Sequence, residues 1–280
     1  MSLPSPNHNL AEFRIWMSLY QKPQGFTNLW YRIKAECLTG TEAQMIKAIF
    51  FDLYGTLIDI NTDEQDPYVY FILSRFLSYH SVKIVPEELK REYFEEIEKQ
   101  FRKSRETFPE VDLYKIFSMI MNKYGRRWYP KSVVVDSAML FRSLTIKQFG
   151  LFPNIIETLF QIQGQYKIAI ISDAQWIFAE PEVEILGLDR FFKQRILSSQ
   201  YGYKKPDMRL FRAAMKKFRV KPEESLYIGD NIRKDLVGAK EAGMRFIYFG
   251  QEIEEYNGFK PDGVFSDYSE LGRVISEIKA

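Results

Sequence analysis

The sequence predicts an α/β protein in which a parallel sheet carries an inserted helical domain. Two observations lead to this fold class. Short apolar runs bounded by Gly, Asp or Ser alternate with helical patterns in residues 46–62 and 150–280, and this alternation is typical of parallel strands joined by right-handed crossovers. Residues 63–149, which lie between these two parts, show helical periodicity throughout.

The chain opens with residues 1–45, which contain many aromatic side chains but follow no clean period. Met45 stands directly before a strong strand, and we consider two hypotheses for what precedes it. In the first, translation starts at Met45, and residues 1–44 are a start-site artefact or a floppy extension. In the second, these residues form a partner-binding arm built on tryptophans such as Trp16 and Trp30.

The sheet is predicted from five apolar runs of strand length. These runs are Ala48–Phe51, Lys167–Ile171, Arg195–Leu197, Leu226–Ile228 and Arg245–Phe249. Helical patterns separate most of them, for example Met208–Phe218 and Ile232–Ala242. In a parallel sheet of this kind, reactive groups lie just beyond the carboxyl ends of the strands. Because the helical residues 63–149 interrupt the first crossover, we expect them to form a lid above that edge.

Residues 63–149 are expected to form a small bundle of four helices. Three apolar stripes recur at helical spacing, and they consist of Val69, Ile72, Leu73, Phe76 and Leu77; Leu89, Tyr93, Ile97 and Phe101; and Leu113, Ile116, Phe117, Ile120, Met121 and Tyr124. Pro86 suits the first turn of the second helix, and Gly125 suits the end of the third. A fourth helix is expected between Ser132 and Lys147.

Composition and charge exclude several classes of protein. The 39 basic and 37 acidic side chains leave a net charge of +2. This charge lacks the strong basic excess that is typical of proteins that bind nucleic acid or an anionic membrane. The longest apolar runs are far shorter than a membrane span, and the N-terminus lacks a secretory pattern. Because Cys37 is the only cysteine, no disulfide can form within the chain, and we expect a reducing, cytoplasmic setting.

Polar residues follow four of the predicted strands, in the order Asp52, Ser172-Asp173, Lys204-Lys205 and Asp230. Carboxylates collected at one edge of a sheet repel each other unless a cation separates them. Mg²⁺ prefers oxygen ligands and keeps several waters, so that the carboxylates of Asp52 and Asp230 with one carbonyl oxygen would be enough to bind it. Asp52 could then attack a phosphoryl group, Ser172 could donate to its oxygens, and a lysine could stabilise the developing charge.

These residues carry a resemblance to a known superfamily. Phe51-Asp52-Leu53-Tyr54-Gly55-Thr56-Leu57 resembles the first signature of the haloacid dehalogenase superfamily, and its second, third and fourth signatures resemble Ser172, Lys205-Pro206 and Gly229-Asp230 with Asp235. One such motif is weak evidence, because short motifs recur by chance. Four motifs in the right order, each after a predicted strand, indicate membership over about residues 46–270.

The resemblance implies a Rossmann-like core with a helical cap inserted after the first signature. It also implies a hydrolase that acts on a small-molecule substrate, with Asp52 as the nucleophile. Mg²⁺ would be held by Asp52, by the backbone carbonyl of Tyr54 and by Asp230, and Asp235 would support these ligands. Lys205 is the implied catalytic lysine, rather than Lys204, because the lysine of the family directly precedes the proline. The predicted substrate and phosphate contacts are Thr56, Ser172, Asp173 and Tyr54.

One position departs from the family pattern. Phosphatases of this superfamily usually carry a second aspartate two residues after the nucleophile, where this chain has Tyr54. The haloacid dehalogenases have a tyrosine there and need no metal. Asp230 nevertheless favours a Mg²⁺-dependent phosphatase of a small phosphorylated metabolite, because a carboxylate facing Asp52 without a cation would weaken the nucleophile. Two alternatives stay open: a 2-haloacid dehalogenase, and a catalytically weak family member that serves as a binding protein.

Overall fold

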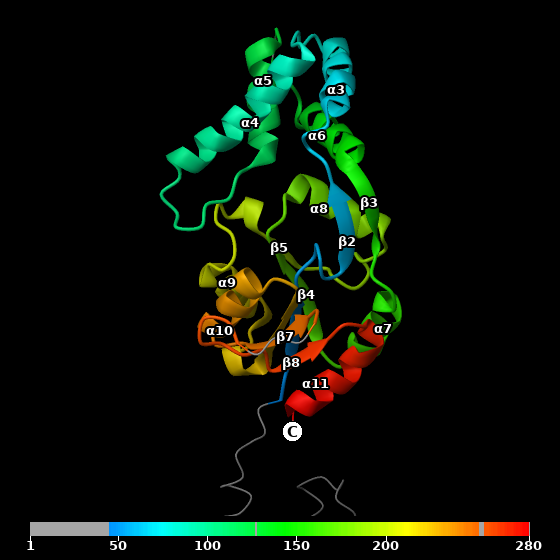
Figure 1. Cartoon of the computed structure of the whole chain (residues 1–280), viewed down its shortest axis with the longest axis vertical. Coiled ribbons are helices and arrows are strands. Elements are labelled where there is room, and N and C mark those ends of the chain that lie inside the picture. The colour runs from blue at the N-terminus through cyan, green and yellow to red at the C-terminus, as the bar shows by residue number, and fades with distance from the viewer. Residues whose placement is uncertain (1–44, 127, 252–254, 280) are drawn as a thin grey trace, which may run out of the picture. The chain divides into compact units, whose positions relative to one another are not determined.

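The predicted parallel sheet is present in a computed structural model, which describes residues 45–126, 128–251 and 255–279 (Figure 1). Six strands pair in the order β5-β4-β1-β6-β7-β8, and every pair is parallel. Their bounds are β1 Ala48–Phe51, β4 Lys167–Ser172, β5 Arg195–Leu197, β6 Ser225–Gly229, β7 Arg245–Phe249 and β8 Gly263–Phe265. The α/β class is confirmed, and β8 is an edge strand that was not predicted. Both hypotheses for residues 1–44 fall outside the described residues.

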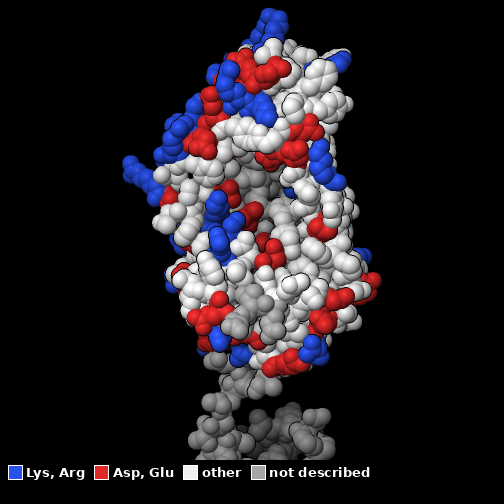
Figure 2. Space-filling model, viewed as in Figure 1, with Lys and Arg blue, Asp and Glu red and all other residues white. Residues whose placement is uncertain are grey.

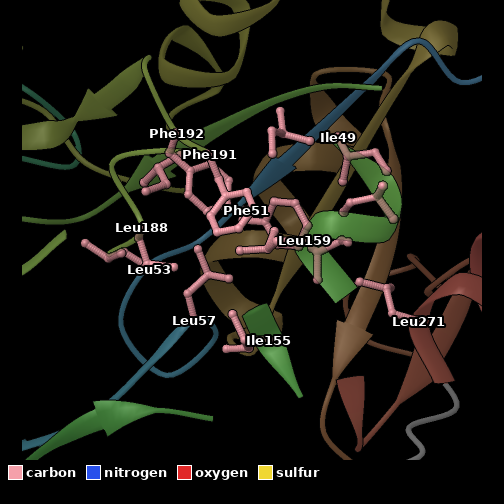
Figure 3. Close-up of a cluster of buried hydrophobic side chains, with 14 of the residues drawn as sticks. Ile49, Phe51, Leu53, Leu57, Ile155, Leu159, Leu188, Phe191, Phe192 and Leu271 are labelled. Atoms are coloured by element: carbon pink, nitrogen blue, oxygen red, sulfur yellow. The ribbon is translucent and has the colours of Figure 1, made fainter. Parts of the chain in front are cut away.

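The central strands are buried on both faces, because helices cover both sides of the sheet. Neighbouring side chains of a strand point to opposite faces. Ile49 and Phe51 pack on one face against α7, α8 and α11 (Figure 3). Ala48 and Phe50 lie on the other face, which α9 and α10 cover. These helices are α7 Ile155–Ile162, α8 Trp176–Ile185, α9 Met208–Phe218, α10 Val237–Glu241 and α11 Leu271–Lys279.

Between β1 and β4 the chain leaves the sheet and forms the helical insertion, which consists of α3 Pro67–Tyr79, α4 Pro86–Lys103, α5 Leu113–Tyr124 and α6 Lys131–Thr145. Its apolar stripes meet in a core of their own, to which Ile177 and Phe178 of α8 also belong. As predicted, Pro86 begins α4, and α5 ends at Gly125. None of the helices in the described residues is long and apolar enough to cross a membrane.

The prediction that residues 63–149 are helical throughout is wrong at its end. The fourth helix stops at Thr145 and does not reach Lys147, because β3 (Ile146–Leu151) pairs in antiparallel register with β2 (Ile58–Thr62). The two strands carry the chain into and out of the helical insertion (Figure 1). Their pairing joins segments that lie far apart in the sequence, so that the local pattern of residues 146–149 gives no sign of it.

Phe141→Ala should lower the free energy of unfolding by about 3–5 kcal/mol, which is the usual cost of emptying a buried aromatic position. The Phe141 ring is fully buried and contacts the rings of Tyr70, Tyr93 and Phe117. Urea titration followed by circular dichroism measures the change. Met139→Ala on the same helix is the control, because Met139 is 40 % exposed, and equal losses in both variants would contradict this packing.

Candidate active site

The polar residues predicted from the sequence come together at one edge of the sheet. β1 pairs with both β4 and β6, so that Asp52, Ser172 and Asp230 lie at the carboxyl ends of three neighbouring strands. The surface is hollowed between the helical insertion and the sheet, and both acidic and basic side chains are visible in the hollow (Figure 2). The crossover rule for parallel strands is the reason that such distant segments meet here.

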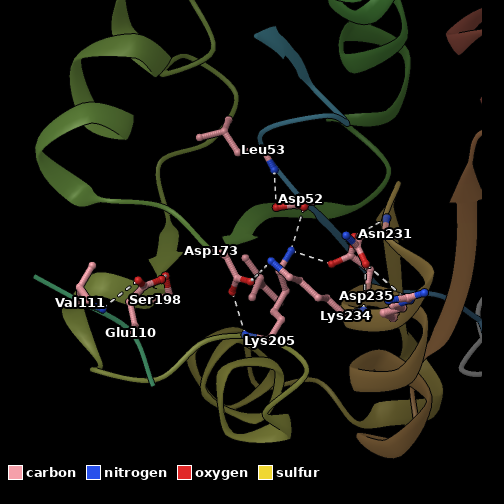
Figure 4. A network of polar contacts seen from close by, with 12 residues as sticks. Asp52, Leu53, Glu110, Val111, Asp173, Ser198, Lys205, Asn231, Lys234 and Asp235 are labelled. Carbon is pink, nitrogen blue, oxygen red and sulfur yellow. Dashed lines mark hydrogen bonds and ion pairs between the residues drawn. The ribbon is translucent and has the colours of Figure 1, made fainter. Parts of the chain in front are cut away.

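Lys205 is the centre of a buried network of charges (Figure 4). Its Nζ atom lies 2.6 Å from Asp235 Oδ1, 2.8 Å from Asp52 Oδ2 and 3.0 Å from the hydroxyl of Tyr227. Burial alone would lower the pKa of Lys205, but the charges of Asp235 and Asp52 raise it above its usual value, so the ammonium stays protonated. The neighbouring Lys204 lies elsewhere, with its Nζ atom 5.3 Å from the centre of the Phe101 ring.

Three carboxylates form the acidic part of this network. Asp52, Asp230 and Asp235 each have an oxygen atom within 4.8 Å of the others. Both oxygens of Asp235 are engaged, because Oδ1 contacts Lys205 and Oδ2 accepts a hydrogen bond of 3.0 Å from the backbone N–H of Asn231. Asp235 is also fully buried, whereas Asp52 and Asp230 keep some exposed surface. Asp52 and Asp230 are therefore the better candidates for holding a cation, and Asp235 lies where it can support them.

The donor set at Asp52 and Asp230 fits a hard divalent cation such as Mg²⁺. Burial, followed by the charge of Asp52, raises the pKa of Asp230 above its ordinary value. Repulsion of this kind between two carboxylates is relieved when a cation lies between them. Carboxylate oxygens are also the ligands that Mg²⁺ prefers in proteins.

The predicted phosphate contacts are held in different ways. Ser172 is buried at the end of β4. The Thr56 hydroxyl donates a hydrogen bond of 2.7 Å to Asp230 Oδ1. The backbone N–H of Lys205 donates to Asp173 Oδ1 at 2.8 Å, while Oδ2 lies 3.2 Å from the Nζ atom of Lys234. The side chain of Asp173 therefore accepts one hydrogen bond, from Lys205, and forms an ion pair with Lys234. An ionised carboxylate can only accept hydrogen bonds, so Asp173 cannot donate one to a phosphoryl oxygen.

Tyr54 takes part in a contact between the sheet and the helical insertion. Its hydroxyl donates a hydrogen bond of 2.5 Å to Glu182 Oε2 on α8, and Arg142 Nε on α6 lies 2.6 Å from Glu182 Oε1. Burial, with the charge of Glu182, raises the pKa of the Tyr54 hydroxyl well above its usual range. Sequence reasoning missed Glu182 and Arg142 because neither lies in a motif, and their helices meet only in the folded chain.

A cavity of about 510 Å³ lies between the helical insertion and the sheet layer. Its lining includes Lys115 and Lys131 from the insertion, and Trp176 and Tyr201 from the other side. Trp176 is the first residue of α8. It lines this cavity and also packs against Tyr114, with the two ring centres 5.8 Å apart.

Comparison with known proteins agrees with this geometry. A family model for haloacid dehalogenase-like hydrolases matches residues 46–243, which include all four signatures. The chain belongs to the haloacid dehalogenase-like hydrolase family. The resemblance inferred from the motifs is thereby confirmed, and the protein is a hydrolase by family.

Individual members of the haloacid dehalogenase-like family resemble this chain over most of their length. A glyceraldehyde 3-phosphate phosphatase of Pyrococcus furiosus is 28% identical over 241 residues, covering 82% of this chain and 93% of the relative. Pyrophosphatase PpaX of Bacillus mycoides is 26% identical over 241 residues, covering 83% and 98%. The crystal structure of a 2-haloacid dehalogenase from Pseudomonas syringae superimposes with a TM-score of 0.57 at 22% identity, covering 83% of this chain and 99% of that chain, which indicates a shared fold.

Gly55→Ala should lower the affinity for Mg²⁺ by about 10–100-fold, as is typical when the support of a metal ligand is disturbed. Gly55 has a φ of +81°, and an added Cβ atom would overlap the carboxylate of Asp230. Isothermal titration with Mg²⁺ measures the effect. Gly202→Ala is a matched control, because Gly202 also has a φ of +81° but has open space around it. Equal weakening in both variants would show that backbone strain, rather than displacement of Asp230, is the cause.

Proposed function

We propose that the protein is a Mg²⁺-dependent phosphatase, which hydrolyses a small phosphorylated metabolite through an aspartyl phosphate on Asp52. The observation that supports this most directly is the approach of the carboxylate oxygens of Asp52, Asp230 and Asp235 to within 4.8 Å of one another, beside the ammonium of Lys205. Such an arrangement is unfavourable without a cation and suited to phosphoryl transfer with one.

In the first step, an Asp52 carboxylate oxygen forms a bond to phosphorus, while the bond from phosphorus to the ester oxygen breaks and the leaving group departs with that electron pair. Asp52 is oriented for this role, since Oδ1 accepts a hydrogen bond of 2.8 Å from the backbone N–H of Leu53, and Oδ2 lies beside Lys205. In the second step, water attacks the aspartyl phosphate, releasing phosphate and restoring the Asp52 carboxylate.

The other residues of the site bind and orient. Asp52, the backbone carbonyl of Tyr54 and Asp230 would hold Mg²⁺, which would supply charge neutralisation for the phosphoryl oxygens when bound. Thr56 holds Asp230 in place by donating a hydrogen bond from its hydroxyl. Asp235 holds Lys205 in place by accepting a hydrogen bond from its ammonium. Ser172 would donate its hydroxyl hydrogen to a phosphoryl oxygen.

The alternative function of 2-haloacid dehalogenation rests on Tyr54. Against it stands Asp230, whose carboxylate faces Asp52 and would disturb a nucleophile that works without metal. The two relatives described above are named as a phosphatase and a pyrophosphatase, and this supports phosphoryl rather than carbon–halogen chemistry. Because the two names indicate different substrates, the metabolite of this protein has to be identified with a panel of phosphate esters.

EDTA should abolish hydrolysis of p-nitrophenyl phosphate, and added Mg²⁺ should restore it. Asp52→Asn should lower kcat by at least about 10³-fold, because the amide is a poor nucleophile and only binding and electrostatic effects remain. Release of nitrophenolate, followed by its absorbance, measures both effects. 2-Chloropropionate should yield no halide under the same conditions.

Two outcomes would contradict this function. Release of chloride that persists in EDTA would identify a dehalogenase. Full retention of every measured function in Asp52→Asn would identify a binding protein. Glu87→Gln is a suitable control for effects of expression and purification on activity. Glu87 lies in the first turn of α4 in the helical insertion, outside the acidic network.

Aryl and acyl phosphates should be hydrolysed faster than alkyl phosphates, by as much as about 10²–10⁴-fold in kcat/KM. The usual aspartate that protonates the leaving oxygen is replaced by Tyr54, whose hydroxyl hydrogen is already donated to Glu182. A series of phosphate esters with leaving groups of different pKa measures the dependence. Equal rates on an alkyl and an aryl ester would mean that another acid protonates the leaving group.

A further inference from the structure

Protein oxygen atoms enclose the ammonium of Lys205 and leave it little capacity for the substrate. A lysine has three N–H donors, and three oxygen atoms, from Asp52, Asp235 and Tyr227, lie within 3.0 Å of its Nζ atom. The residue is 2 % exposed, so these partners enclose it. Lys205 donates hydrogen bonds to Asp235 and Tyr227 and contacts Asp52 as an ion pair. At most one of its three donors therefore remains for a ligand, and the Asp52 carboxylate lies beside it.

Lys234 lies at the same edge of the sheet and is differently placed. Its only oxygen neighbour at ion-pair distance among the described residues is Asp173 Oδ2, at 3.2 Å, and the contact lacks the geometry of a hydrogen bond. The Lys234 side chain is 42 % exposed. Its ammonium therefore keeps donors that a ligand can use.

Asp173 connects Lys234 to the catalytic network. Its Oδ1 atom accepts the backbone N–H of Lys205, and its Oδ2 atom lies next to the ammonium of Lys234 (Figure 4). Asp173 also directly follows Ser172, at the end of β4. The ammonium of Lys234 is thus held beside the turn that is predicted to receive the phosphoryl group.

The balance of charge at this edge calls for such a cation. Asp52, Asp173, Asp230 and Asp235 carry four formal negative charges, whereas Lys205 and Lys234 carry two positive charges. Two charges from Mg²⁺ would only neutralise this excess. A phosphoryl dianion would then bind a site without net positive charge, and each ammonium with a free donor would matter to its affinity.

We propose that Lys234 contacts the substrate, donating a charge-assisted hydrogen bond to a non-bridging oxygen of the phosphoryl group, and that Asp173 is the positioning residue that holds Lys234 there. This assignment rests on the proposed phosphatase function. It gives phosphate recognition to a residue that lies between Asp230 and Asp235, yet belongs to none of the four signatures.

Binding of inorganic phosphate to the full chain in excess Mg²⁺, measured by isothermal titration, tests the proposal. Lys234→Gln should weaken phosphate binding by about 10–100-fold, the effect expected from losing one hydrogen bond between charged groups. Lys234→Arg should recover much of the affinity, since it keeps the charge and the donors. Arg233→Gln removes the same charge from the adjacent, exposed residue and should leave the affinity unchanged.

A double variant separates substrate contact from simple neutralisation of Asp173. If Lys234 only neutralises Asp173, then Asp173→Asn combined with Lys234→Gln should bind phosphate as tightly as the wild type, and the proposal fails. If Lys234 contacts the phosphoryl group, the double variant should stay weak. Wild-type affinity in Lys234→Gln would also overturn the role of Lys234 alone. A wild type that neither binds phosphate nor hydrolyses esters would overturn the phosphatase function itself.

Discussion

The buried ammonium of Lys205 is the interaction on which the site depends. A charge with 2 % exposure is stable only when acidic partners surround it. Asp52 approaches it from the end of β1, and Asp235 from the helical turn Ile232–Leu236 that follows β6. This requirement holds the carboxylates of Asp52 and Asp235 in one geometry. It also engages two of the three donors of Lys205 in hydrogen bonds to Asp235 and Tyr227.

A second buried ion pair joins the helical insertion to the core. Arg142 comes from α6 of the insertion and Glu182 from α8, and their side chains are only 13% and 5% exposed. Because Tyr54 donates to the same carboxylate, the residue that replaces the usual acid is tied to the position of the insertion. Tyr54 and the helical insertion thus contact the same glutamate.

The sheet could be predicted because its evidence is local. β1 is a four-residue apolar run with both faces covered, and a run of this kind is recognisable without knowing its neighbours. β3 could not be predicted, since Ile146, Lys147 and Gln148 have no strand pattern of their own, and only the pairing with β2 keeps them extended. Pairing between distant segments is a property of the folded chain, which a window of sequence does not contain.

The sequence by itself determined the family and the parallel sheet, and it indicated Asp52, Lys205 and Asp230 as candidate site residues, because each follows a strand in a recognisable motif. Only the tertiary structure decided which groups these residues touch. Glu182 and Lys234 carry no signal in the sequence, and their partners Tyr54 and Asp173 lie on other elements. Motifs record which residue types stand at strand ends, whereas hydrogen bonds and ion pairs arise from distances that the packing of distant segments sets.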